Sequence, residues 1–375
     1  MASDAWLSQD ELTLHLIASG VLRAVGLAEK GNPLSVPYPI PLQLGLDQLV
    51  LASIRRDAKP PQGVPDLMHW CQHPIGSWPL DLSGHEDILV ESLLDGLLPT
   101  EICEAWACAS ADVEAELTEQ ELLRSALSVC QNASAPQSYV AFRRLLIEMP
   151  VLTSFELQKK ISEPELERLR THLTTAYEPA PIACSTESQQ FHCCAECGNL
   201  LLRTGSGGMI CEEQRCRRKQ ANGAVSVGRT IHARDVPMWL NRGLRRFVAA
   251  PGRAELRLEI KLRKLGLNVE LWPAFDRYDL RVSFPDGDVW AVDVKDWADP
   301  CLLAKRIQAD GETPIPTTPF WTKAYFVFPD ERKIERPDYV RAFNNRFPHK
   351  SKHISAEFEV KFLADVKRKL KGINR

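Results

Sequence analysis

The first half of the chain carries the hydrophobic spacing of helices. Apolar residues recur every three or four positions in residues 9–22, after a candidate N-cap at Ser8. Prolines interrupt the pattern in 30–41 and 59–65, which indicates loops. Further helices are predicted at 42–56, 86–97, 101–109, 118–130, 138–148, 153–161 and 164–176.

The pattern changes in the last third of the chain, where runs of alternating and continuous apolar residues indicate strands. A turn containing Pro285, Asp286 and Gly287 joins two of these strands as a hairpin. Helices are predicted at 236–249, 253–265 and 299–309 and at the C-terminus, and strands at 268–273, 278–284, 288–295 and 324–328. From 253 onward the order is αβββαβ, which predicts a mixed sheet flanked by helices.

Between these regions lies a cysteine-rich segment. Two pairs, Cys194-x2-Cys197 and Cys211-x4-Cys216, flank a glycine-rich turn, so four thiolates can converge as a structural zinc requires. The second spacer is longer than usual, and Cys193 or His192 could replace a ligand. An iron–sulfur cluster needs the same four thiolates, and unligated thiols are the simplest alternative.

Length and composition favour several domains in one globular chain. The 375 residues are 44% apolar and 25% charged, and the prolines near 178–181 end the helical block. The predicted domains are an acidic helical domain at 1–180, a zinc ribbon at 181–232 and an α/β domain at 233–375.

The charge of the two halves differs sharply. Residues 1–180 contain 12 basic and 25 acidic side chains, a net charge of −13, whereas residues 181–375 contain 34 and 24, a net charge of +10. A polyanionic partner is therefore expected only for the second half. Candidate phosphate contacts are Arg217, Arg218 and Lys219 beside the cysteines, and Lys305 and Arg306 on the helix after the hairpin.

The expected compartment is the cytoplasm. The N-terminus has early acidic residues and no signal-peptide core, and no apolar run of about 18 residues predicts a membrane span. Eleven cysteines, an odd number, fit a reducing environment better than a disulfide framework.

Acidic residues mark the candidate chemistry. Glu255 lies beside the apolar stripe of its helix, with Glu259 as an alternative in the same helix. Asp279 interrupts one strand of the hairpin, and Asp293 and Lys295 share one face of the other. Three carboxylates and a lysine can thus meet at one end of a small sheet.

Such a set suits phosphodiester hydrolysis. Mg²⁺, or Mn²⁺, takes oxygen ligands, here Asp279, Asp293 and the Val294 carbonyl, and lowers the pKa of a bound water. Lys295 can orient that water and hold the phosphate. If these residues were instead ordinary solvent-facing positions of a hairpin, no site would form.

These residues resemble the PD-(D/E)xK nuclease superfamily. The helix Glu255, the strand Asp279 and the pair Asp293-x-Lys295 match its motif, and the αβββαβ order matches its core over about 250–330. Tyr278 stands where the motif has proline. The resemblance implies that 233–375 is a restriction-endonuclease-like domain with Glu255, Asp279, Asp293 and Lys295 as catalytic residues.

The layout of a helical region, a four-cysteine ribbon and this core is also similar to the restriction-endonuclease-like proteins encoded beside prokaryotic PIWI-like proteins, the pPIWI-RE defence systems. That resemblance implies a metal-dependent DNA endonuclease, with RNA as an open alternative substrate. Its implied partners are a PIWI-like protein and a helicase, and homo-oligomers are compatible with it. The alternatives are a non-catalytic nucleic-acid-binding subunit and a zinc-ribbon regulator, which would give Lys295 no role.

Overall fold

A computed structural model describes residues 7–29, 31–108, 114–205, 207–220, 226–309, 314–347 and 353–373. The chain forms two compact units, each built from two stretches of sequence. The first comprises Met1–Leu123 and Met149–Arg246, and the second comprises Arg124–Glu148 and Phe247–Arg375. The three domains predicted from the sequence follow different boundaries and stay a prediction.

The helix α1 (Gln9–Glu29) forms the core of the first unit. Its start is a capping box, because the Ser8 hydroxyl accepts from the Glu11 N–H at 3.2 Å and the Glu11 carboxylate accepts from the Ser8 N–H at 2.7 Å. A Cβ on Gly20 would lie 2.4 Å from the backbone of Leu42, so glycine lets α1 and α2 (Ile40–Arg55) touch. The sequence therefore predicted this helix and its cap correctly.

Length and composition alone would also let α1 cross a membrane. The structure buries 56% of its most apolar 18-residue window, and α1 packs against α2 and α4 (Glu101–Ala107). That arrangement is typical of a core helix.

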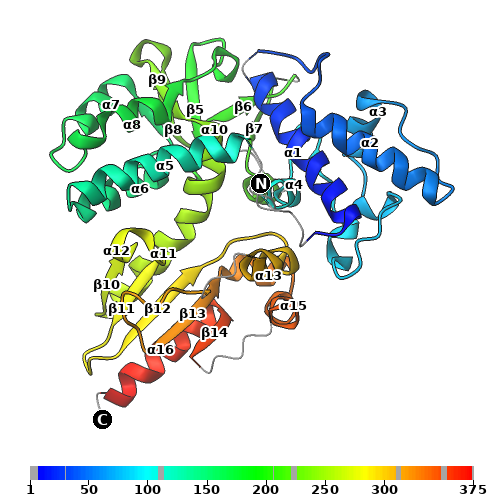
Figure 1. The fold of residues 1–375 in the computed structure, drawn as a ribbon. Helices are drawn as coiled ribbons and strands as arrows, with labels where there is room; N and C mark the ends of the chain where they lie inside the picture. Colours follow the sequence, from blue (N-terminus) through cyan, green and yellow to red (C-terminus); the bar gives the residue numbers. More distant parts are fainter. Residues whose placement is uncertain are drawn as a thin grey trace. The chain divides into compact units, whose positions relative to one another are not determined.

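Short helices and small sheets complete the first unit (Figure 1). The strand β9 (Pro237–Leu240) pairs antiparallel with both β3 (Val151–Thr153) and β4 (Tyr177–Pro179). The other elements are α3 (Val64–Trp70), β1 (Leu94–Asp95), β2 (Leu98–Pro99), α7 (Ser154–Ile161), α8 (Arg170–Ala176), β5 (Gln190–Cys194), β6 (Leu201–Arg203), β7 (Met209–Cys211), α9 (Gln214–Gln220), β8 (Val227–His232) and α10 (Arg242–Leu244), while α5 (Glu114–Asn132) passes from the first unit into the second.

A mixed sheet of five strands forms the second unit, in the order β10-β11-β12-β13-β14. The first three strands are antiparallel, and β12, β13 and β14 run parallel. The elements are α6 (Pro136–Glu148), α11 (Ala250–Lys264), β10 (Asn268–Leu271), α12 (Pro273–Asp276), β11 (Leu280–Ser283), β12 (Val289–Val294), α13 (Pro300–Ala309), β13 (Lys323–Phe328), α14 (Asp330–Glu335), α15 (Tyr339–Arg346), β14 (Ile354–Phe358) and α16 (Glu359–Ile373).

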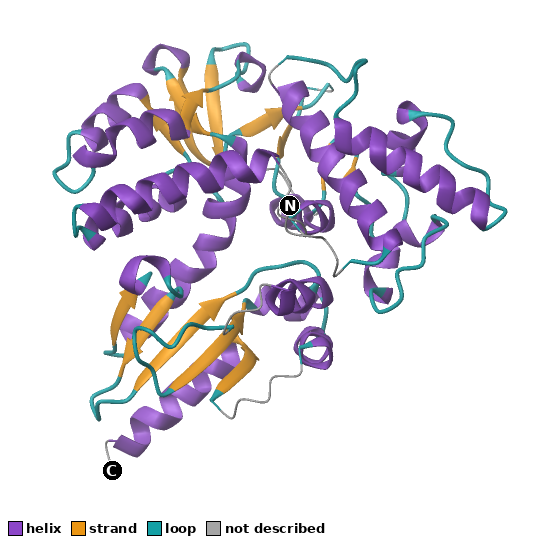
Figure 2. Cartoon of the chain, viewed as in Figure 1, coloured by secondary structure: helices purple, strands orange, loops and turns teal. Residues whose placement is uncertain are grey.

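Helices cover both faces of this sheet (Figure 2). On one face, Ala291 and Phe326 pack with residues of α13 and α15 such as Leu303 and Phe343. On the other face, the Trp290 and Tyr325 rings lie 5.0 Å apart and pack against α16. Since side chains alternate along β12, Asp293 and Lys295 belong to the face of Ala291, which α13 and α15 cover.

The predicted αβββαβ order and mixed sheet are confirmed, but two of the predicted helices, at 86–97 and at the start of 236–249, were wrong. Residues 86–97 form a 3-10 turn at Glu86–Val90 and then β1, because Leu94 N–H donates to the Cys71 carbonyl at 2.8 Å instead of closing a helical turn. Residues 237–240 form β9, and the helix begins only at Arg242. The fifth strand, β14, was missed.

Candidate active site

The strand β12 delivers two of the predicted residues to one place. Asp293 is the fifth of its six residues, and Lys295 follows the strand with its N–H donating to the Val327 carbonyl at 3.0 Å. The Lys295 Nζ donates to Asp293 Oδ1 at 2.9 Å. Burial by itself lowers the pKa of Lys295, but the neighbouring carboxylates, Asp293 first, outweigh burial and raise it. The surrounding carboxylates therefore favour the charged form of Lys295.

Asp279 lies directly opposite this pair. Leu280 pairs with Val292, so one further step of the same antiparallel register brings Asp279 beside Asp293. The Asp279 Oδ2 accepts the Val294 N–H at 2.6 Å. Burial, followed by the charges of Glu255 and Asp293, raises the pKa of Asp279 well above its usual range. Carboxyl groups crowd here, and a cation would relieve the repulsion between their ionised forms.

Glu255 reaches the same group from α11. Its side chain is 4% exposed and accepts from Trp272 Nε1 at 2.6 Å. Burial raises the pKa of Glu255, and the charge of Asp276 adds to that effect. Glu259, the alternative, instead pairs with Arg144 at 2.7 Å and Arg263 at 2.9 Å. Glu255 is thus the glutamate of α11 that interacts electrostatically with Asp279.

The helix α6 adds residues that sequence reasoning missed. Arg143 Nη2 donates to both oxygens of Glu255, at 3.0 and 3.1 Å, and lies 3.9 Å from Asp279 Oδ1. The same guanidinium pairs with Asp276, which also accepts from the Tyr139 hydroxyl at 2.8 Å. The sequence did carry one indication: Arg143 stands four residues after Tyr139 and next to Phe142, at the edge of the buried stripe of an amphipathic helix.

The backbone beside Glu255 is strained. Trp272, Ala274, Phe275 and Asp276 have φ between 47° and 66°, so α12 is a left-handed turn rather than a helix. Each such non-glycine residue costs about 1–3 kcal/mol, and such strain concentrates at functional sites. The turn ends strand β10 at Leu271, earlier than predicted. It places Trp272 so that its Nε1–H donates to Glu255 and its ring lies 4.6 Å from the guanidinium carbon of Arg143.

The carboxylates form a looser group than the cysteines. Among the described residues, only the four cysteines place three or more candidate ligand atoms within 4.8 Å of one another. Asp279 and Asp293 each use one oxygen internally, for Val294 N–H and Lys295 Nζ, and retain the other. Asp279 Oδ1, 3.9 Å from Arg143 Nη2, and the second oxygen of Asp293 are the donor type that Mg²⁺ or Mn²⁺ prefers, so the residues fit such an ion.

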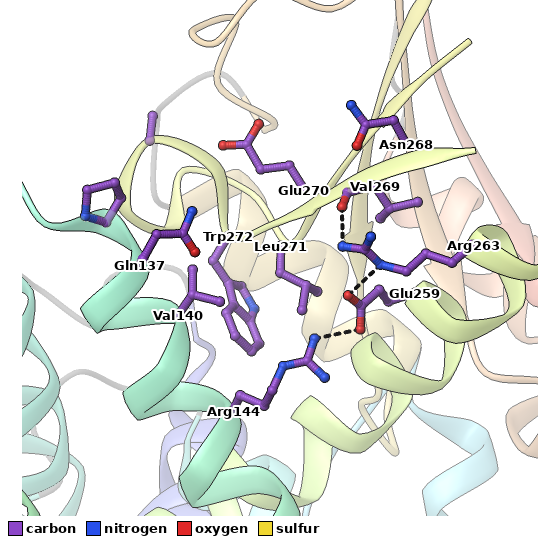
Figure 3. Close-up of a pocket in the computed structure, with 12 residues that line it drawn as sticks. Gln137, Val140, Arg144, Glu259, Arg263, Asn268, Val269, Glu270, Leu271 and Trp272 are labelled. Carbon is purple, nitrogen blue, oxygen red and sulfur yellow. Dashed lines mark hydrogen bonds and ion pairs between the residues drawn. The ribbon is translucent and has the colours of Figure 1, made fainter. Parts of the chain in front are cut away.

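A groove of about 360 Å³ is lined in part by Trp272 (Figure 3). Its walls include Gln137 of α6, Glu270 of β10 and Arg263 of α11. Arg263 also donates to the Val269 carbonyl at 2.6 Å, which ties α11 to β10. The groove thus combines polar and apolar side chains and is bordered by Trp272, which contacts Glu255.

The four predicted cysteines converge in the first unit. Their sulfurs lie within 4.8 Å of one another and all four side chains are buried: Cys194, Cys197, Cys211 and Cys216. Gly198, at φ 76°, makes the turn after the first pair, and its N–H donates to the Cys194 carbonyl at 2.9 Å. Four thiols at this spacing can hold a metal, and a soft ion such as zinc suits them.

The two alternative ligands lie elsewhere. Cys193 points into a separate cluster with Phe191 and Trp239, since neighbouring residues of β5 face opposite sides. The His192 ring bonds the Thr230 hydroxyl at 2.8 Å. The described cluster therefore consists of the four cysteines first chosen.

The predicted phosphate-binding residues have different surroundings. Arg217 is buried and pairs with Asp95 at 2.9 Å while donating to the Glu212 carbonyl at 2.5 Å, which argues against phosphate contact. Arg218 pairs with Glu91, and Lys219 with Glu196, at the surface. Lys305 and Arg306 are half-buried on α13, which covers the sheet face of Asp293.

Two family models match the chain. Residues 252–374 match the model described as "REase associating with pPIWI_RE", and residues 13–153 match "pPIWI_RE three-gene island domain Y". The first covers Glu255, Asp279, Asp293 and Lys295, and the second covers Arg143. No curated protein and no solved structure matches the chain. The two matches support the likeness to pPIWI-RE systems.

Proposed function

We propose that the protein is a metal-dependent DNA endonuclease of a pPIWI-RE defence system, with a restriction-endonuclease-like core in its second unit. The observation that carries this proposal is the meeting of Asp279, Asp293 and Lys295 at adjoining strand ends. The match of the surrounding segment to a restriction-endonuclease-associated model supports it.

Each residue has a distinct task in this proposal. Asp279, Asp293 and the Val294 carbonyl would hold Mg²⁺ or Mn²⁺, which when bound supplies an acidified water and stabilises phosphate charge. Lys295, fixed by Asp293 at 2.9 Å, holds a phosphate oxygen and orients the attacking water. Glu255 completes the negative field that draws the cation.

The basic side chains would guide nucleic acid. Lys305 and Arg306 lie on the helix that covers the face of Asp293 and Lys295, so we assign them to phosphate contacts near the site. Arg218 and Lys219 are weaker candidates because acidic partners already neutralise them. DNA is the proposed substrate, and RNA is tested beside it.

The cysteine cluster would bind one zinc as a structural centre, because four cysteines leave no open position for a substrate. A PIWI-like protein and a helicase of the same system are the proposed partners. The matches to a pPIWI_RE-associated family and to a three-gene island domain support partners from the same system. The acidic first half would dock a protein.

Plasmid cleavage with Mg²⁺ or Mn²⁺ tests the proposal. Wild-type protein should nick or linearise DNA, and Asp293→Ala should reduce the rate at least about 100-fold while leaving the fold intact. Glu270→Gln is the matched control, since it removes an exposed carboxylate from β10 of the same sheet. Wild-type protein that binds DNA but never cuts it would favour the non-catalytic subunit instead.

A further inference from the structure

The position of Arg143 gives the acidic site a fixed cation. Its guanidinium contacts Glu255 through two hydrogen bonds, pairs with Asp276 and lies 3.9 Å from Asp279. The Trp272 ring packs against it at 4.6 Å, and the side chain is only 14% exposed. An arginine held on this many sides is a built part of the site, not a mobile surface charge.

Charge at the site can be counted from the described side chains that interact there. Four carboxylates, Glu255, Asp276, Asp279 and Asp293, face two cations, Arg143 and Lys295. A bound divalent cation favours the ionised carboxylates. With all six groups ionised the site carries two negative charges, which one such cation neutralises. A second divalent cation would leave an excess of positive charge in a buried place, which is costly.

The carboxylates of the site fall into two pairs with different partners, Glu255 with Asp276 and Asp279 with Asp293. Arg143 hydrogen-bonds Glu255 and pairs with Asp276, but its Nη2 lies 3.9 Å from Asp279 Oδ1, beyond hydrogen-bond distance. That oxygen and the second oxygen of Asp293 are used by neither Val294 N–H nor Lys295. An ion at Asp279 and Asp293 therefore has ligands available, while an ion at Glu255 would have to displace the guanidinium.

We propose that the Arg143 guanidinium stands where a second divalent cation would bind, so that the site takes a single divalent cation at Asp279, Asp293 and the Val294 carbonyl. This inference rests on the proposed nuclease function. It makes Arg143 a positioning residue, supplied by a helix more than 100 residues before the acidic motif, and it keeps Glu255 outside the ligands of the ion.

Manganese titration of the full-length, zinc-loaded protein tests the inference without any cleavage assay. Bound Mn²⁺ is counted from the loss of the free-ion electron paramagnetic resonance signal. Wild-type protein should bind one Mn²⁺, and Asp293→Ala should bind none. Arg143→Ala should bind two, because Glu255 and Asp276 lose their cation.

Three further variants make the result specific. Arg144→Ala removes an arginine of the same helix that pairs with Glu148 and Glu259, so it should still bind one Mn²⁺. Arg143→Lys keeps a cation and should also bind one. Glu255→Gln, the gentlest change, should still bind one Mn²⁺, with lower affinity because one negative charge is lost, even if Arg143→Ala does not fold.

The outcomes separate the two proposals. Two Mn²⁺ ions in wild-type protein, one in Arg143→Ala, or loss of binding in Glu255→Gln would each overturn the inference about Arg143 and leave the nuclease proposal standing. If wild-type protein binds no Mn²⁺ and cuts no DNA, both proposals fail together.

Discussion

The contact between α6 and α11 depends on the absence of one side chain. A Cβ added at Gly252 would lie 2.4 Å from Ile147 Cδ1 and 2.6 Å from Cγ1. Carbon atoms pack at about 3.5–4.0 Å, so Gly252→Ala requires a shift of roughly 1 Å. Ile147 is 2% exposed and cannot turn into solvent, so we expect α6 to move and to carry Arg143 away from Glu255.

The size of the effect follows from two opposing terms. Alanine stabilises a helix interior by about 0.5–1 kcal/mol relative to glycine, whereas overpacking a core costs about 1–3 kcal/mol. Gly252→Ala should therefore destabilise the contact by up to about 2 kcal/mol. Ile147→Ala alone should cost about 2–5 kcal/mol through the cavity that it leaves. Together the two changes should cost about 1–3 kcal/mol less than their sum, since the new methyl group enters that cavity.

Hydrogen exchange measures the loss of stability in the two helices that make the contact, α6 and α11. Protection of the amides in Pro136–Glu148 and Ala250–Lys264 should fall in each single variant and recover partly in the double variant. A matched control is Gly266→Ala, which lies in open space beyond α11 at φ 82° and should not couple to Ile147. Additive effects, within about 0.5 kcal/mol, would refute the steric explanation.

Other predictions concern charge and the cysteines. Cys211→Ser should remove the zinc and lower the melting temperature of the first unit, as elemental analysis and calorimetry would show; unchanged zinc content would contradict the ligand set. Folding raises the pKa of Asp279, so the stability that this group contributes without Mn²⁺ is lost as pH rises through that pKa. Asp279→Asn should therefore make the melting temperature fall less steeply with rising pH than in wild-type protein. An equal slope in both proteins would contradict this. Burial alone would raise the pKa of Glu212, but Arg245 and Arg246 outweigh it and lower the pKa to about 2. Glu212→Gln should thus cost about 3 kcal/mol at pH 7, a difference that urea titrations should find shrinking below pH 4.5 and vanishing near pH 2.

Local sequence patterns were enough to predict that the strand residues of the candidate site lie close together. Alternation along a strand places Asp293 and Lys295 on one face, and a hairpin turn brings Asp279 to the same end. The four cysteines were equally readable from their spacing. In each case the residues that come together lie within about 30 positions of one another, so turns and periodicity determine which side chains are in contact.

Contacts between residues far apart in the sequence could not be predicted from local patterns. Arg143 meets Glu255 across 112 positions, and no local pattern states which distant carboxylate an arginine will find. The same limit explains β9, whose Trp239 pairs with Val151 from the other side of the cysteine segment. Strand β14 is short and carries Ser355 and Glu357, so its pairing with β13 determines its structure more than its composition does.

The discontinuous second unit has a consequence for biosynthesis. Residues 124–148 leave the ribosome about 100 residues before Ala250–Lys264, so α6 must wait for its partner while the whole intervening segment is made. Until then Tyr139 and Arg143 have no carboxylate of the second unit to bind. A gene fragment that began at 233 would never supply them, and Glu255 would emerge without its arginine. The charge balance around Glu255 can therefore form only after residues 255–295 have been made, more than 100 residues after Arg143.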